Sequence, residues 1–498
     1  MIRKQWRAVF FLTFCCGVAV AQVTTTAPSV VAPVSTLAPS QVTAAPRAPG
    51  LQTQGQGQAQ NPFLGSVPSV PPAAGPMELS LKDAIDLGLK YNLGLFLTSQ
   101  GTVQARAARL RSLSDLLPKL DLRVAESVQQ INLAALGFPL TAASRFGINT
   151  IAGPFSIFDV RGVLSESLDL KSLNNYRSAG ENVRASQFSL QDARDLVVLV
   201  VGGTYIEVVS SAARVEAVQA QVITAQGLYQ QAVDMKRAGT VAGIDVLRAQ
   251  VELQVQQQRL VAAENDFEKL KLTLLREIGL PVGQQIILTD KMPYAPAPAI
   301  NLEELIQRAY RSRGDYQAMI ASRRAAELAR KAAVGEGLPS IQLNADYGTL
   351  GNTPGNSHGT FTSAAALKVP LFQGGKVRAE IQQADALLRQ REAEAEDMRG
   401  RIEFEVRSAL LDVNAASRQV DVARSSVDLA TQQLQQARDR FAAGVTNNIE
   451  VVQAQEALAT TNENYVSSLF AHNFAKLSLA RAVGIAEQAV KQFLGGVP

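Results

Sequence analysis

The sequence predicts a mainly helical protein with some β structure, in which long coiled-coil-like helices and four strands arise from an internal duplication. Three observations predict this fold class. The body of the chain is written twice, two long stretches contain no proline, and alternating residues follow a Leu-Pro pair in each half. With 47% hydrophobic and 18% charged residues, the chain of 498 residues has the composition of a protein that packs a core.

The first 21 residues predict a secretory signal peptide. Three basic residues precede an apolar run, and Ala19-Val20-Ala21 supplies the small residues that a signal peptidase reads. That run is shorter than the roughly 20 residues that a membrane-spanning helix needs. Both cysteines, Cys15 and Cys16, lie inside it, so we expect a mature chain without disulfides or thiol chemistry.

Residues 22–76 predict a disordered linker rich in Pro, Ala and Gln. They hold ten of the 21 prolines and a single charged residue, Arg47. Because such a composition cannot bury an apolar core, we expect an extended segment ahead of the folded body.

Internal sequence similarity predicts that the folded body consists of two repeats, residues 77–290 and 291–498. Residues 230–280 align with 435–485 without a gap, and 17 of these 51 positions are identical. The offset of 205 residues (444 minus 239) is far longer than a solenoid repeat of roughly 20 to 50 residues. The chain is therefore expected to contain a duplicated domain.

Each repeat predicts a short opening helix and two strands. The helices are expected at 79–93 and 302–316, and the first strands follow Pro118 and Pro339 with alternating residues. Second strands are expected at about 155–170 and 360–372, each long enough for a tilted strand of roughly 9 to 11 residues across a bilayer.

The proline-free regions predict long helices that end in hairpins. Small apolar residues recur at steps of three and four from Val406 to Phe441, which is a coiled-coil seam. A helix over 171–238 would reach about 100 Å at roughly 1.5 Å per residue. Gly239 and Gly444 are expected to end these helices, with a second helix following each of them.

The route across a membrane, if there is one, is expected to use strands. Beyond the signal peptide we expect no segment apolar enough for a spanning helix, the nearest run stopping at Gly202-Gly203. Backbone groups in lipid must all be paired, so an open sheet of four strands cannot span. Because the smallest spanning barrels have eight strands, three chains with twelve strands would close one.

Several motifs in order resemble the TolC-like outer membrane efflux proteins. They are the paired openers LSLKDAIDLGLKYNLGL and LEELIQRAYRSRGDYQAMI, VPLFQGGK at 369–376, and the turns AGTVAGIDVLRAQ and AGVTNNIEVVQAQ. The resemblance covers about residues 78–486. The first half departs from it at 168–172, where Leu-Asp-Leu-Lys-Ser replaces the Pro-Leu-Phe-Gly-Gly segment.

The resemblance implies a homotrimer in the outer membrane. Its twelve strands would form a transmembrane β-barrel, continued by a trimeric α-barrel in the periplasm. The implied partners are outer-membrane lipid, a periplasmic adaptor (membrane fusion) protein and an inner-membrane transporter, as in tripartite efflux or type I secretion. The channel would be a passive exit duct, and the transporter would supply the energy.

The resemblance also implies a periplasmic pore constriction at Glu450 and Asp245. Three Glu450 carboxylates around a threefold axis would favour cations. The alternative is that both acids only favour the positive end of a helix. A second acid one turn later, common in the family, is replaced by Arg248 and Gln453, which predicts a less negative constriction.

The hairpin tips are also the expected adaptor-docking sites. The residues that this prediction places there are Gly239, Gly444, Gln250 and Gln455. The glycines have an alternative role as ordinary residues that end helices.

No catalytic, cofactor or metal site is predicted. The mature chain has two histidines, His358 and His472, and no Gly-rich phosphate loop. The 48 basic and 44 acidic residues form no basic stripe, which argues against nucleic acid. The open alternatives are a periplasmic helical-hairpin adaptor, which would normally carry one hairpin, and a secreted coiled-coil structural protein.

Overall fold

The computed structural model describes residues 61–67, 75–132, 135, 151–290, 294, 301–446 and 448–489. All of them belong to one compact unit, Ala59–Pro498. The predicted signal peptide and most of the predicted linker lie outside the described residues.

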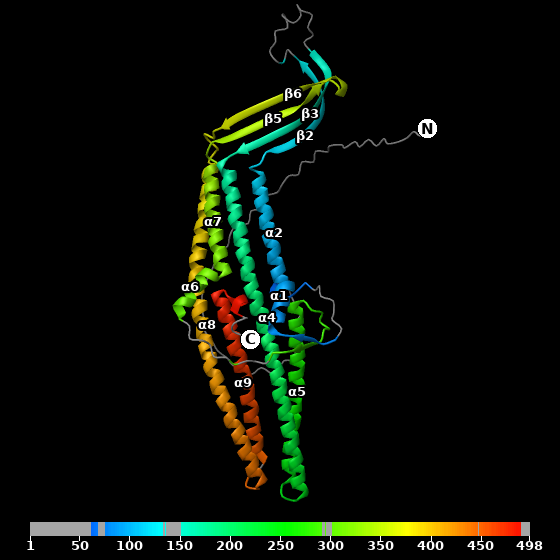
Figure 1. Ribbon diagram of the computed structural model, residues 1–498, viewed down its shortest axis with the longest axis vertical. Coiled ribbons are helices and arrows are strands. Elements are labelled where there is room, and N and C mark those ends of the chain that lie inside the picture. Colours follow the sequence, from blue (N-terminus) through cyan, green and yellow to red (C-terminus); the bar gives the residue numbers. More distant parts are fainter. Residues whose placement is uncertain are drawn as a thin grey trace, which may run out of the picture. The chain divides into compact units, whose positions relative to one another are not determined.

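The described chain is mostly helical with some strands, which confirms the fold class to that extent (Figure 1). In the first half the elements are η1 (Pro62–Leu64), β1 (Met77–Leu79), α1 (Leu81–Tyr91), α2 (Leu93–Ser114), β2 (Lys119–Asn132), β3 (Ile151–Leu168), α4 (Leu170–Arg237), α5 (Gly243–Ile278) and β4 (Ile286–Leu288). In the second half they are α6 (Leu302–Ser312), α7 (Gly314–Gly335), β5 (Ser340–Gly351), η3 (Pro354–Asn356), β6 (Ser357–Lys368), α8 (Lys376–Ala442), α9 (Asn448–Val483) and α10 (Ala486–Ala489).

The two halves repeat the same helices at nearly the same lengths. α1 and α6 have 11 residues each, and α2 and α7 have 22 each. The long helices α4 and α8 have 68 and 67 residues, and α5 and α9 have 36 each. This agreement extends the duplication beyond the residues that align in sequence.

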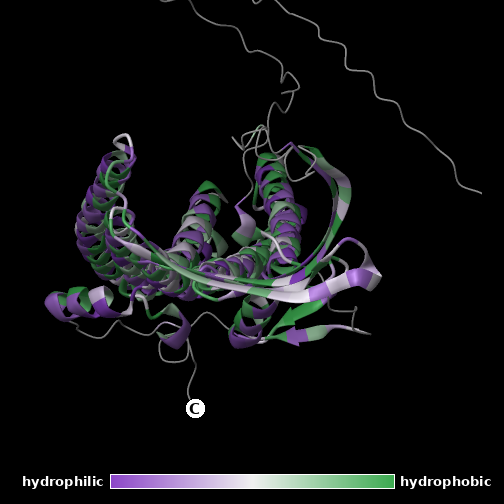
Figure 2. Ribbon diagram, turned by 90° about the horizontal axis from the view of Figure 1, so that it is seen from above, coloured by the Kyte–Doolittle hydropathy of each residue, from purple (hydrophilic) through white to green (hydrophobic). Residues whose placement is uncertain are grey.

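The four predicted strands form one antiparallel sheet in the order β2-β3-β5-β6. β3 and β5 come from different halves of the chain, so their pairing joins the two halves. β6 ends at Lys368, four residues before the predicted end, because Pro370 cannot donate a ladder hydrogen bond. Figure 2 shows the sheet as a curved ribbon.

The long helices begin differently in the two halves. Asp169 caps α4 by accepting a hydrogen bond from the Ser172 backbone N–H at 2.6 Å. α8 instead follows Gly374 and Gly375, whose φ angles are +60° and +84°. The motif departure at 168–172 is therefore a change from a glycine turn to a carboxylate cap.

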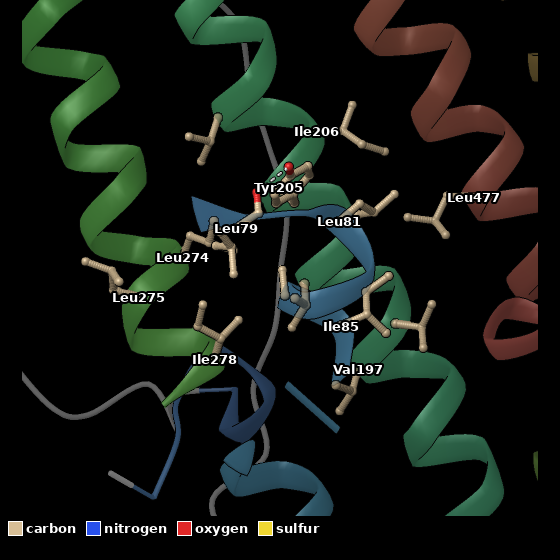
Figure 3. Packing of buried hydrophobic residues seen from close by; sticks show 14 of the residues in the cluster. Leu79, Leu81, Ile85, Val197, Tyr205, Ile206, Leu274, Leu275, Ile278 and Leu477 are labelled. Atoms are coloured by element: carbon tan, nitrogen blue, oxygen red, sulfur yellow. Dashed lines mark hydrogen bonds between the residues drawn. The ribbon is translucent and has the colours of Figure 1, made fainter. Parts of the chain in front are cut away.

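Two apolar cores surround the short opening helices. The first packs α1, β1 and β4 against α4 and α5, and Figure 3 shows Tyr205 among its aliphatic side chains. The Tyr205 hydroxyl donates a hydrogen bond to the Leu79 carbonyl at 3.0 Å. The second core packs α6 against α8 and α9. The coiled-coil seam predicted on α8 comprises eleven apolar residues from Val406 to Phe441. It is confirmed, because ten of the eleven are buried and Val427 is half-buried.

One expectation about hydropathy was wrong. An 18-residue window of α4 has a mean hydropathy of 1.8, so this helix is long and apolar enough to cross a membrane by composition alone. However, 61% of that window is buried inside the protein, where Val197, Val198 and Val201 belong to the first core. The apolar residues around Gly202-Gly203 therefore pack in the first core of the protein.

A short stretch of the predicted linker is ordered. Asn61–Val67, hereafter the N-terminal clasp, contains the 3-10 helix η1 and a bridge between Ser66 and Asn92. Composition did not predict this contact, because a segment of seven residues needs no core of its own when it packs on an existing one.

Candidate functional site: the two-faced sheet and the hairpin tips

The sheet has one apolar and one polar face. Leu122, Tyr347 and Phe361 lie in one row across the register, with exposed fractions of 74%, 76% and 75%. The adjacent row carries Arg123 and Arg161 on the opposite face, since neighbouring residues of a strand point to opposite sides. One apolar and one polar face are what a sheet needs between lipid and water.

The polar face carries an ion-pair network. Arg161 binds Asp159 through two hydrogen bonds of 2.5 and 2.7 Å, and it reaches Asp346 on β5 at 3.2 Å. The network therefore links β3 to β5, the two strands that join the halves of the chain.

In the described part of the chain, the outer strands of the sheet each have one paired neighbour. β2 pairs only with β3, and β6 pairs only with β5. Both edges are long, at 14 and 12 residues, and they present unpaired backbone groups of the kind that recruit another strand.

The two hairpin tips have the same geometry. Gly239 and Gly444 adopt φ angles of +76° and +71°, which favour glycine. The backbone N–H of the following residue, Thr240 or Val445, donates to the carbonyl five residues before it at 2.9 and 3.0 Å. This hydrogen-bond pattern is a Schellman motif, so both glycines end their helices as predicted.

Both predicted constriction acids lie in the first turn of the second hairpin helix, and each contacts an arginine of its own chain. Asp245 accepts from Arg248 at 3.3 Å. Glu450 lies 3.6 Å from Arg440 Nε and also accepts a hydrogen bond from the Thr446 hydroxyl. Each carboxylate therefore already has a guanidinium group of its own chain within 4 Å.

The four predicted docking residues do not share one environment. Gly239, Gly444 and Gln250 are exposed, whereas Gln455 is buried with 7% of its surface accessible. Gln455 lines a small cavity with Leu434 and Gln256.

Sequence reasoning missed the role of Arg440. Its distance of ten residues from Glu450 matches no helical or strand spacing, and the two meet only because the turn at Gly444 reverses the chain. A search across the two arms of each predicted hairpin would have paired them.

Residues 305–485 match the family model described as outer membrane efflux protein. The chain is 25% identical over 313 residues to outer membrane protein TolC of Vibrio cholerae serotype O1, covering 60% of this chain and 70% of that protein. It is 24% identical over 402 residues to the pyoverdine export outer membrane protein OpmQ of Pseudomonas putida, covering 78% of this chain and 82% of that protein.

Solved structures show the same fold. The Campylobacter jejuni CmeC outer membrane channel superposes with a TM-score of 0.70 at 18% identity, over 88% of this chain and 94% of that chain. A membrane protein from Pseudomonas aeruginosa gives a TM-score of 0.70 at 20% identity, over 81% and 90% of the two chains. Residues 305–485 thus match the outer membrane efflux protein family, and over most of its length the chain has the fold of TolC-like outer-membrane channels.

Proposed function

We propose that this protein is the exit duct of a tripartite efflux or type I secretion system, built as a homotrimer. The observation that carries the proposal is the four-stranded sheet with two faces of opposite polarity and two long edges that pair with no other described strand. Successive strands are antiparallel, so β6 of one copy would meet β2 of the next antiparallel as well. Three copies would close a barrel of twelve strands with no edge left in lipid.

The helices would extend this barrel into the periplasm. β3 leads into α4 after one residue and β6 leads into α8 after residues 369–375, and both helices run to the hairpin tips. Three chains would contribute six hairpins to an α-barrel. We propose that the exposed tip residues Gly239, Gly444 and Gln250 contact a periplasmic adaptor, which connects the channel to an inner-membrane transporter. The buried Gln455 would then support the tip by packing. The repeats 77–290 and 291–498 remain our proposed domain division.

The trimer is tested by the subunit stoichiometry of the protein extracted in detergent. We expect light scattering, corrected for bound detergent, to give three chains per particle. A monomer that stays soluble without detergent would contradict both the barrel and the trimer, because the exposed apolar row on the sheet would then have no lipid to meet.

We also propose that Glu450 and Asp245 form the periplasmic pore constriction, together with their partners Arg440 and Arg248. In planar bilayers, Arg440→Ala is expected to raise the preference for cations, since it removes the charge 3.6 Å from Glu450. Glu450→Gln is expected to lower that preference. The matched control is Asp439→Asn at an exposed carboxylate of the same tip, with no expected change. Equal shifts in all three variants would place Glu450 outside the conducting path.

A further inference from the structure

The corners between the opening helices differ in how they meet the end of the hairpin. α1 turns into α2 at Asn92, and α6 turns into α7 at Arg313. Since the flanking helices have equal lengths, Asn92 and Arg313 are equivalent positions, as are Tyr91 and Ser312. The last carbonyls of the neighbouring long helix, α5 or α9, need hydrogen-bond partners at this corner.

In the second repeat these partners come from the corner itself. Arg313 Nη1 donates to the Ala482 carbonyl at 3.2 Å, and the Ser312 hydroxyl donates to the Val483 carbonyl at 2.6 Å. The end of α9 is therefore bound by side chains of the same repeat.

In the first repeat the equivalent corner residue, Asn92, makes different contacts. The Asn92 side chain caps α2, accepting from the Gly94 N–H at 2.9 Å. The end of α5 is bound instead by the N-terminal clasp, whose Ser66 hydroxyl donates to the Arg276 carbonyl at 2.5 Å. A segment ahead of the repeat thus binds the last turn of α5, at a carbonyl one residue before the position equivalent to Ala482.

The clasp is held along its length by hydrogen bonds to the corner. Asn92 Nδ2 donates to the Phe63 carbonyl at 2.7 Å, and the Leu93 N–H donates to the Gly65 carbonyl at 2.9 Å. The Val67 N–H donates to the Tyr91 carbonyl at 2.8 Å. Backbone groups of the clasp and the corner therefore bind each other, in the manner of a docked peptide.

The aromatic ring of Phe63 occupies a place that only glycine leaves open. A Cβ atom at Gly94 would lie 2.5 to 2.8 Å from three atoms of that ring, closer than real contacts allow. The ring also packs against the first apolar core. The corner is thus shaped around an aromatic residue at this position of the clasp.

We propose that the α1–α2 corner and the end of α5 form a docking site for an aromatic peptide segment, filled by this chain's own Asn61–Val67. The clasp binds the last turn of α5, just as Arg313 and Ser312 bind the last turn of α9 in the second repeat. The folded body consequently includes Asn61–Val67, which lies within the segment whose composition predicts disorder.

The test compares two substitutions in η1 of the full-length protein in detergent. Phe63→Ala is expected to lower the midpoint of thermal unfolding by about 5 °C, because it empties a packed aromatic site. The matched control Leu64→Ala lies on the same turn but is 46% exposed, and a shift of about 1 °C or less is expected there. Equal shifts for the two variants would overturn the docking site.

Two further measurements keep the outcome independent of general destabilisation. Gly94→Ala should lower the midpoint strongly in the wild-type background but much less with Phe63→Ala, because the clash partner is then gone. Hydrogen exchange over 61–67 should be slow in the wild-type protein and at least about tenfold faster in Phe63→Ala. Additive effects, or exchange in the wild type as fast as in a free peptide, would contradict the proposal.

Discussion

Replacing Arg313 with methionine is expected to lower the free energy of unfolding by about 3 to 5 kcal/mol, since it removes one partner of a buried charge cluster. Arg313 is 2% exposed and binds Asp315 at 2.6 and 3.0 Å and Glu405 at 2.5 Å. Methionine has a similar length but leaves both carboxylates and the Ala482 carbonyl without this donor. Chemical denaturation of the detergent-solubilised protein at pH 7.5 measures the loss.

The pH dependence of this loss identifies its cause. Burial by itself would raise the pKa of Asp315 and Glu405, but the hydrogen bonds and charge of Arg313 hold both below their usual range. In the wild type these two groups add stability at neutral pH that is lost as pH falls through their lowered pKa values. In Arg313→Met the two carboxyls lose that partner, and burial then favours their neutral form. The difference in unfolding free energy between wild type and variant should therefore become smaller as pH falls toward about pH 4.

Arg401→Met is the matched control for Arg313→Met. Arg401 also binds Glu405, at 2.8 Å, but its side chain is 63% exposed. We expect it to change stability by less than about 1 kcal/mol. A comparable loss in both variants, or a deficit in Arg313→Met that stays constant with pH, would show that the charge cluster contributes little.

The sequence predicted the helices and their turns because these depend on local patterns. The α8 seam follows from residues repeating every three or four positions, and the tips follow from Gly239 and Gly444. The strands after Pro118 and Pro339 were equally visible as alternation, although β6 ended before its predicted boundary. The periodic spacing of apolar residues therefore predicted most of the helices and strands.

The candidate site was predicted only in part, because its charge balance depends on contacts across turns and between repeats. The constriction at Glu450 and Asp245 stays a prediction, and the contact of Glu450 with Arg440 was not foreseen because it requires the reversed chain at the tip. The clasp was missed for a related reason. Phe63 packs on helices more than 25 residues away in sequence, and no local pattern around Phe63 predicts this contact.

A buried carboxyl in the first core is expected to make the stability of this protein depend on pH. Glu277 on α5 is 1% exposed and directly precedes Ile278, the last residue of this helix, which Figure 3 shows in the first core. Among the described residues, its Oε2 atom has no hydrogen-bond partner. Burial, with a smaller contribution from the Glu207 carboxylate on α4, raises the pKa of Glu277 from 4.5 to about 7, against the opposing effects of Thr204 and Arg276.

The sign follows from the raised pKa. As pH rises above about 4.5 the unfolded chain ionises Glu277 while the folded protein keeps it neutral, so stability falls until about pH 7 and is then constant. Glu277→Gln removes this loss, because the amide is neutral throughout. At pH 8 the variant is expected to be more stable than the wild type by up to about 3 kcal/mol, and at pH 4 the two should be nearly equal.

Glu268→Gln on the same helix separates burial from the loss of a charge. Its carboxylate is 63% exposed and bound to Lys271, so it should leave the pH profile of unfolding unchanged. If Glu277→Gln and the wild type keep parallel profiles from pH 4 to 8, Glu277 is ionised in the folded protein. Water or a second copy would then have to reach its Oε2 atom, which makes the profile a direct measure of how closed the first core is.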